Sequence, residues 1–199
     1  MVLDAILSTG MALPVCAVDP HKVGSRIGGV LVEGGDELLP KLESCGVTHF
    51  VMGIGGLGTS TLRPRLWKAV LDCGLTPLSV IHASALVSSS ASIGAGAQIL
   101  ARAVVNVSAQ IGSGSIVNTA AVVEHDCIVG SFCHLAPMSC LGGGVKIGDN
   151  SHLGIGAVVR EYRVLGSGTL VGCGGALVSD LPDNSSALGV PAKVTRNEV

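Results

Sequence analysis

His125 and Asp126 are neighbours in the sequence and supply the residue types of a general base and its acidic partner. An imidazole can accept a proton from an attacking nucleophile near neutral pH. An adjacent carboxylate can hold the ring in the useful tautomer and raise its basicity. We therefore predict that His125 and Asp126 are catalytic, although a lone histidine is often no more than an exposed turn residue. The residues around the pair must decide between these interpretations.

The surrounding sequence repeats with a period of six. Steps of six from Ile81 to Leu177 meet only Ile, Leu or Val, at seventeen successive positions. Four places after each of the first sixteen aliphatic residues comes a small one, with Val145 and Arg163 as the exceptions. A helical period of about 3.6 cannot sustain this register, and a two-residue strand alternation does not require it. The pattern predicts short strands stacked in successive coils.

A second period of eighteen lies on top of the first. Glycine follows the aliphatic residue at five positions with this spacing, namely Gly94, Gly112, Gly130, Gly148 and Gly166. Three short strands per coil make a triangular prism, with aliphatic side chains stacked inside and small residues at the tight corners. The spacing does not determine the handedness of the coil, and general connection statistics would favour a right-handed one.

Residues 1–78 follow different rules and predict a separate small α/β domain. Helices are expected over residues 2–11, over 36–44 with Asp36 as N-cap, and over 62–73. Strands are expected over residues 13–18 and 48–54. The second strand is followed by Gly53, Gly55, Gly56 and Gly58. Strand, glycine-rich turn and helix together offer backbone N–H groups to a phosphate, although glycine is common in turns for other reasons.

Composition argues against several classes of partner. The net charge is -2 and no block of Lys or Arg stands out, so we expect no nucleic acid partner. No apolar run approaches the roughly 18 residues that cross a bilayer, and no secretory signal is evident. We therefore expect no membrane partner. The seven cysteines show no paired C-x-x-C spacing, which favours a cytoplasmic protein with cysteines as buried fillers.

Five segments carry a resemblance to a known family, namely residues 30–36, 53–55, 81–85, 118–126 and 189–193. In these segments the chain resembles the bacterial sugar O- and N-acetyltransferases of the hexapeptide-repeat, left-handed β-helix type. That family includes sialic-acid O-acetyltransferases and UDP-4-amino-sugar N-acetyltransferases. The resemblance covers nearly the whole chain.

The resemblance implies a mainly β fold, with a left-handed parallel β-helix over residues 79–182 and a tail or last coil over residues 183–199. It implies that residues 1–78 are a Rossmann-like domain whose first strand and glycine-rich loop are missing, so that this domain is N-terminally truncated. Most members of the superfamily are trimers with active sites between neighbouring prisms. We therefore expect a homotrimer.

The resemblance also implies further site residues. It places His134, Gly143, Ile155 and Cys173 against acetyl-CoA, with the backbone N–H of Gly143 facing the thioester oxygen. It places Asn118, Gly55 and Gly56 near the sugar or nucleotide-sugar acceptor. Ile155 and Cys173 could equally be ordinary coil surface. The implied reaction is acetyl-CoA-dependent acetylation of the amine of a nucleotide-linked amino sugar, in surface glycan biosynthesis and without a metal.

Three alternatives stay open at this point. The same base would serve O-acetylation of a hydroxyl on a sialic acid-like sugar. His134 and His152 are eighteen residues apart and would stack, so a zinc site like that of β-helix carbonic anhydrases is possible with His125 as third ligand. A non-enzymatic scaffold would explain the prism but gives no reason for the His125–Asp126 pair.

Overall fold

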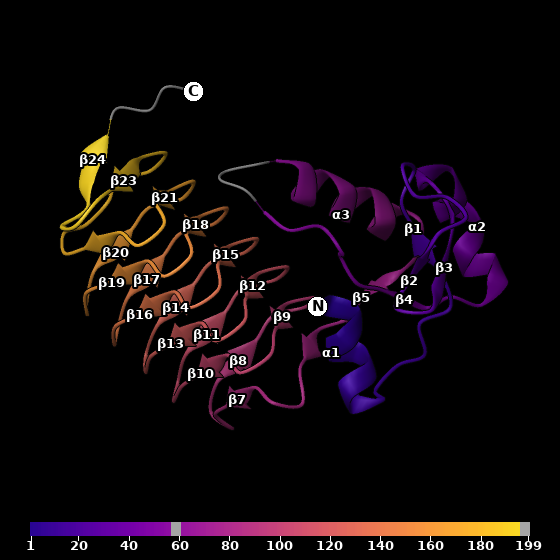
Figure 1. The fold of residues 1–199 in the computed structure, drawn as a ribbon, viewed down its shortest axis with the longest axis horizontal. Coiled ribbons are helices and arrows are strands. Elements are labelled where there is room, and N and C mark those ends of the chain that lie inside the picture. The colour runs from indigo at the N-terminus through magenta and orange to yellow at the C-terminus, as the bar shows by residue number, and fades with distance from the viewer. Residues whose placement is uncertain (57–60, 196–199) are drawn as a thin grey trace.

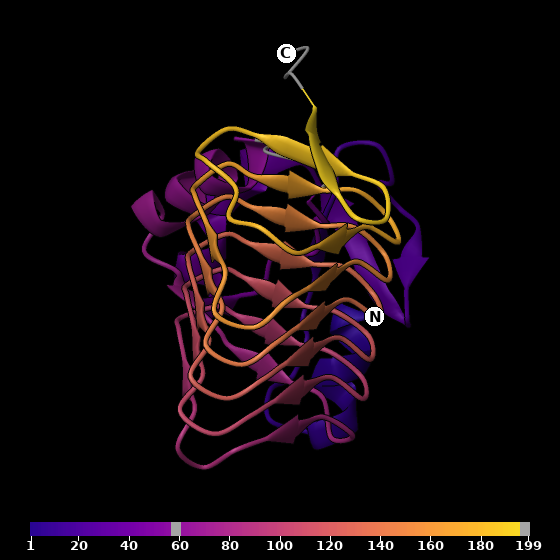
Figure 2. The same cartoon turned by 90° about the vertical axis from the view of Figure 1, so that its left-hand side faces the viewer.

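The computed structural model describes residues 1–56 and 61–195. Gly58, one of the four glycines singled out in the sequence, lies outside the described residues. The chain forms a prism of stacked coils with a smaller N-terminal part along one side of it (Figures 1 and 2). The prism is the left-handed parallel β-helix that the resemblance implied.

Three parallel sheets, here called face one, face two and face three, form the sides of the prism. Face one holds β6 (Val80–Ile81), β9 (Gln98–Ile99), β12 (Ile116–Val117), β15 (His134–Leu135), β18 (His152–Leu153), β21 (Leu170–Val171), β23 (Ser186–Leu188) and the antiparallel β24 (Lys193–Thr195). Face two holds β7 (Leu86–Val87), β10 (Val104–Val105), β13 (Val122–Val123), β16 (Cys140–Leu141), β19 (Val158–Val159) and β22 (Ala176–Leu177). Face three holds β8 (Ser92–Ile93), β11 (Gln110–Ile111), β14 (Ile128–Val129), β17 (Lys146–Ile147) and β20 (Val164–Leu165).

The second residue of each strand points into the prism and stacks on its equivalent in the next coil. On face three the paired residues are Ile93, Ile111, Val129, Ile147 and Leu165, which confirms the predicted register. Burial of such columns is the main source of stability of the prism.

Both exceptions to the small-residue rule, Val145 and Arg163, are accommodated. Val145 is fully buried, and Arg163 reaches out to Asp180, with 3.4 Å between Nη1 and Oδ1.

The glycines spaced by eighteen serve coil stacking. A Cβ built on Gly94 would lie 2.6 Å from the backbone nitrogen of Ser113 in the next coil, and this glycine has no left-handed φ. The left-handed corner conformation falls two residues later in the repeat and admits other residues, including Asp126 at φ 60°. Close approach of adjacent coils, rather than the corner itself, therefore requires glycine at these positions.

The N-terminal part combines short helices with two small sheets (Figure 1). Its helices are α1 (Val2–Thr9), α2 (Leu39–Leu42) with 3-10 turns on either side (Asp36–Leu38 and Glu43–Cys45), and α3 (Leu62–Asp72). One sheet holds β1 (Ala17–Val18), β2 (Arg26–Ile27) and β3 (Val30–Gly34), and the other pairs β4 (His49–Phe50) with β5 (Thr76–Pro77). The expected division into domains at residues 78 and 182 stays a prediction.

Two expectations for this part were wrong in detail. Asp36 does not cap the helix: the residue before the first 3-10 turn is Gly35, whose N–H donates to the Glu37 carboxylate at 2.8 Å. The expected strands over 13–18 and 48–54 shrink to the two-residue strands β1 and β4. After β4, two backbone carbonyls accept hydrogen bonds from side chains of the prism instead of from a neighbouring strand. The carbonyl of Met52 accepts from Gln98 Nε2 and that of Gly56 from His134 Nδ1, each at 2.7 Å.

Face one is the side of the prism that the N-terminal part covers (Figure 1). α1 packs Ala5 and Ile6 against Val80, Leu100 and Ile116. α3 packs Trp67 edge-on against Phe132, with ring centroids 5.4 Å apart. Packing from both helices fixes residues 52–56 on the outer side of face one, beside the column that contains His134.

Candidate active site

His125 and Asp126 lie together on the corner between face two and face three, in the turn that joins β13 to β14. His125 Nδ1 and Asp126 Oδ2 are 2.8 Å apart, and both side chains are largely exposed. A carboxylate can only accept, so Nδ1 carries a proton, and in the neutral ring Nε2 keeps its lone pair. The arrangement presents Nε2 as a base to anything that reaches this corner.

The turn that carries His125 is held by a second carboxylate. Glu124 accepts from the backbone N–H of His125 at 3.3 Å and from the Asn106 side-chain amide at 3.0 Å. Asn106 occupies the equivalent turn in the preceding coil. The His125 backbone is thereby tied to the neighbouring coil, which leaves the imidazole as the projecting group.

Gly143 lies next to His125 in the following coil. The N–H of Gly144 donates to the His125 carbonyl at 2.8 Å, and a Cβ built on Gly143 would lie 2.5 Å from His125 Nε2. Within the described residues the N–H of Gly143 has no hydrogen-bond partner. The lone pair of Nε2 and an unused backbone donor therefore occur side by side, as a base and an oxyanion donor would.

A second cluster forms on face one around His134. Its Nδ1 donates to the Gly56 carbonyl at 2.7 Å, so Nε2 must accept from the Asn118 amide nitrogen 3.0 Å away. Asn118 in turn accepts from the Thr119 N–H at 2.8 Å. Burial lowers the pKa of His134, the Gly56 carbonyl opposes this, and the charge of Arg63 lowers it further. Both ring nitrogens of His134 are used within the chain.

His152 stacks edge-on against His134 from the next coil, with ring centroids 5.0 Å apart. Its side chain is 9% exposed, and its Nδ1 is buried without a partner among the described residues. Burial, and then the neighbouring His134, lowers the pKa of His152 to about 4. This histidine is neutral at physiological pH.

The remaining predicted residues divide between these places. Ile155 and Cys173 are exposed on the corner between face one and face two, in the turns that stack above the turn of Asn118. Gly55 is exposed and Gly56 buried. Within one chain the predicted site residues therefore fall into two groups, with His125, Asp126 and Gly143 on one corner and the others on or beside face one.

Sequence reasoning missed Arg63. This residue lies in the first turn of α3 and is 4% exposed, and its guanidinium donates to the carbonyls of Gly114 and Phe132. No local pattern marks it, because an arginine near the start of a polar helix is ordinarily solvated. Its burial could be learned only from how α3 packs on the prism.

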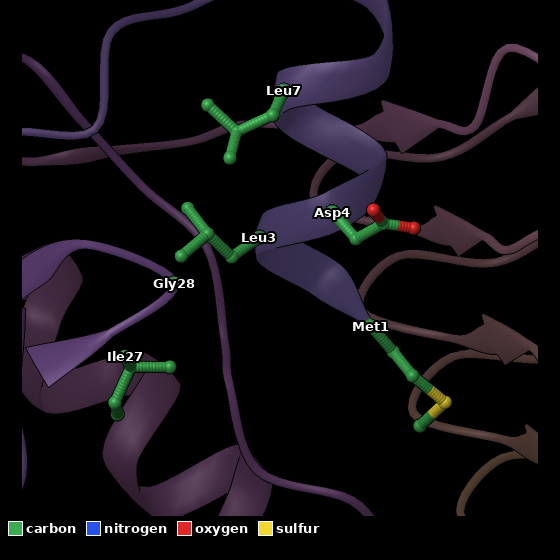
Figure 3. A pocket seen from close by; sticks show the side chains of 6 residues that line it. All are labelled: Met1, Leu3, Asp4, Leu7, Ile27 and Gly28. Atoms are coloured by element: carbon green, nitrogen blue, oxygen red, sulfur yellow. The ribbon is translucent and has the colours of Figure 1, made fainter.

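Other places on the molecule offer less chemistry. Among the described residues no three His, Cys, Asp or Glu side chains are grouped so as to hold a metal ion. A hollow of about 200 Å³ lies between α1 and the β2–β3 turn, and Figure 3 shows its lining of Met1, Leu3, Asp4, Leu7, Ile27 and Gly28. It shares no residue with the predicted site.

In the described part of the chain, no helix has the length and apolarity to cross a membrane.

The left-handed parallel β-helix is the fold of the hexapeptide-repeat acyltransferases. Comparison with known structures narrows the class. A histidine-to-alanine variant of GDP-perosamine N-acetyltransferase from Caulobacter crescentus, in complex with CoA and GDP-perosamine, is 38% identical, with a TM-score of 0.92 over 98% of this chain and 91% of that one. The acetyltransferase domain of PglB from Neisseria gonorrhoeae FA1090, in complex with acetyl coenzyme A, is 34% identical, with a TM-score of 0.90 over 98% and 92%. The chain belongs to the bacterial sugar acetyltransferases of the hexapeptide-repeat family.

Two further comparisons are more limited. A Schizosaccharomyces pombe protein named as an acetyltransferase is 36% identical to this chain over 52 residues. The match spans 26% of this chain and 25% of the length of that relative. No family model matches the sequence.

Proposed function

We propose that the protein transfers the acetyl group of acetyl-CoA to the amine of a nucleotide-linked amino sugar. The observation that carries the proposal is the exposed Nε2 of His125 with the free N–H of Gly143 beside it. The chain shares its fold and 38% of its aligned sequence with an enzyme whose structure holds CoA and GDP-perosamine.

The geometry gives each group one task. The neutral amine nitrogen attacks the thioester carbonyl, and the N–H of Gly143 donates to the oxygen that becomes negative. His125 Nε2 takes the proton released from the attacking nitrogen and passes it to the departing CoA sulfur. Asp126 keeps Nδ1 protonated and stabilises the imidazolium while it exists. The N-acetylated amino sugar and free CoA are the products, and His125 returns to its initial state.

The two groups of site residues support a trimeric assembly. The outward-facing first residues of the strands on face two are all apolar, namely Leu86, Val104, Val122, Cys140, Val158 and Ala176. Leu86 and Val158 are exposed in the single chain. We propose that a threefold axis runs parallel to the prism in front of face two. Such an axis brings the Asn118 corner of one copy beside the His125 corner of the next.

The assembly proposal is tested by light scattering. Val122→Lys should dissociate the trimer and abolish turnover, because a charge replaces an apolar residue at the centre of face two. Val164→Lys on face three is the matched control and should remain trimeric. A wild-type monomer that is fully active would contradict the assembly.

The acceptor and the cellular setting are part of the same proposal. Gly55 and Gly56 are proposed to contact the nucleotide sugar, and Ile155 and Cys173 the pantetheine arm of acetyl-CoA. The use of acetyl-CoA would place the reaction in the cytoplasm. A metal takes no part in the proposed steps, since His125 and the Gly143 N–H supply the base and the oxyanion donor.

The activity is tested with a panel of UDP- and GDP-linked amino sugars and acetyl-CoA, with release of free thiol as the readout. The expected result is turnover with at least one amino sugar and an N-acetyl product by mass spectrometry. Turnover only with hydroxyl acceptors such as sialic acid would replace the proposal with O-acetylation. Acetyl-CoA that neither binds nor reacts would exclude acetyl transfer.

A further inference from the structure

Arg63 is a buried cation held by backbone carbonyls. Its guanidinium donates to the carbonyl oxygens of Gly114 and Phe132, on the corner between face three and face one. Among the described residues it forms no ion pair, and its Nε has no hydrogen-bond partner. Burial lowers the pKa of this guanidinium, while the neighbouring Cys133 thiol acts in the opposite direction. A buried charge without a carboxylate is costly, so a side chain of this kind calls for an explanation beyond packing.

The guanidinium lies against the backbone of Gly56. A Cβ built on Gly56 would be 3.6 Å from Arg63 Nη1 and 3.6 Å from the Cβ of His134. Gly56 is thus placed between the arginine and the histidine, and its carbonyl accepts from His134 Nδ1. The two side chains come from α3 and from the prism, and together they fix the Gly56 peptide at the end of residues 52–56, which lie on face one.

A chain of hydrogen bonds continues from this peptide to Asn118. The Gly56 carbonyl selects the Nδ1–H tautomer of His134, and this tautomer leaves Nε2 to accept from the Asn118 amide. The other end of that amide is fixed, because Asn118 Oδ1 accepts from the Thr119 N–H. The residues that the resemblance placed near the acceptor, Gly55, Gly56 and Asn118, are therefore connected through His134.

We propose that Arg63 is a positioning residue for acceptor binding, which seats Gly55 and Gly56 against His134 and thereby sets the orientation of Asn118. The inference rests on the proposed function, since it concerns the acceptor half of the same site. Arg63 acts through Gly56 and His134 and takes no part in proton transfer. Loss of its contacts should leave the His125 corner intact.

Steady-state kinetics separate this role from a merely structural one. Arg63→Met removes the donors, Arg63→Lys keeps the charge and some of the donors, and Arg65→Met is the matched control on the exposed side of the same helix. Arg63→Met is expected to raise KM for the nucleotide-linked amino sugar by about tenfold or more. KM for acetyl-CoA should stay within about twofold of wild type, because both ring nitrogens of His134 are bonded within the chain and neither is left to bind acetyl-CoA. Arg63→Lys should recover part of the loss, and Arg65→Met should match wild type. An unchanged acceptor KM, or a fall in kcat with both KM values unchanged, would overturn the inference.

The histidine tautomer gives a readout that does not depend on turnover. In nitrogen-15 spectra of the uniformly labelled protein, with the His134 signals assigned by their loss in His134→Gln, the wild type should show a protonated Nδ1 and an unprotonated Nε2. Arg63→Met should give a mixture of tautomers, and Arg65→Met should not. A wild type without acetyl transfer would remove the proposed function but leave this test intact. Retention of the single tautomer in Arg63→Met would overturn the role of Arg63.

Discussion

The backbone of Gly143 lies so close to the imidazole of His125 that a Cβ on the glycine would be 2.5 Å from Nε2. The two residues are in adjacent coils, and the hydrogen bond from the Gly144 N–H to the His125 carbonyl holds those coils in register. Gly143 does not have a left-handed φ, so an alanine there meets a steric conflict without backbone strain. Substitution of Gly143 therefore tests whether the position of the His125 ring matters for turnover.

Gly143→Ala should displace the His125 ring and lower kcat by roughly tenfold or more, because a misplaced base loses its alignment with the attacking nitrogen. The melting temperature should change little, since the exposed ring can move away. Gly53→Ala, which has open space around its Cβ, is the control and should retain full activity. If Gly143→Ala turns over at the wild-type rate, Nε2 is not the reacting atom.

His125→Ala should remove most turnover while the protein keeps its assembly and melting temperature. A general base contributes about 10²–10⁴-fold, and this side chain is largely exposed, so its loss creates no cavity in the core. His21→Ala, at an exposed position in the N-terminal part, is the control. Retention of more than about a third of wild-type kcat would be too small a loss for a general base and would show that His125 is not one.

Asp126→Asn should lower kcat by less than the loss of the base does. Asparagine tolerates the left-handed φ of 60° at this position and still offers an oxygen to Nδ1–H, so only the charge is lost. The carboxylate is exposed, where an ion pair is worth about 0–1 kcal/mol, which corresponds to a loss of about fivefold or less. The measurement is kcat for both variants under the same conditions, and a larger loss for Asp126→Asn would reverse the two roles.

Stability should fall as the pH is lowered from about 6.5 toward 4, because the pKa of His152 is about 4 in the folded protein and that of an unfolded histidine is about 6.5. The unfolded chain then binds more protons than the folded chain, so the stabilisation is complete above the unfolded pKa and is lost progressively below it. The effect is on the order of 3 kcal/mol, and the lowered pKa of His134 acts in the same direction.

His152→Leu removes the buried titrating group, and leucine already occupies the next position of the column at Leu170. Urea unfolding between pH 4 and pH 7 should show a shallower dependence on pH for this variant than for the wild type. Identical slopes would mean that His152 does not control the acid sensitivity of the fold.

The sequence alone determined the prism and the place of the proposed catalytic pair, His125 and Asp126. Strict periods of six and eighteen define which residues point inward, which coils are neighbours, and that His125 and Gly143 stack on one corner. These relationships are local or repeat at a fixed spacing, so they follow from the pattern itself. The same pattern places His134 half a coil from His125 and so on another face, but it cannot show how copies of the prism are arranged.

Only the tertiary structure decided how the N-terminal part lies on face one. Residues 52–56 read as the end of a strand, yet their carbonyls are satisfied by Gln98 and His134, and His134 is 78 residues from Gly56. The burial of Arg63 likewise depends on carbonyls 51 and 69 residues away in the chain. Such contacts have no period, and the chemistry of an arginine or a glycine does not indicate its partner. They arise when α3, residues 52–56 and face one pack against one another, and this packing depends on the folded shape of each part.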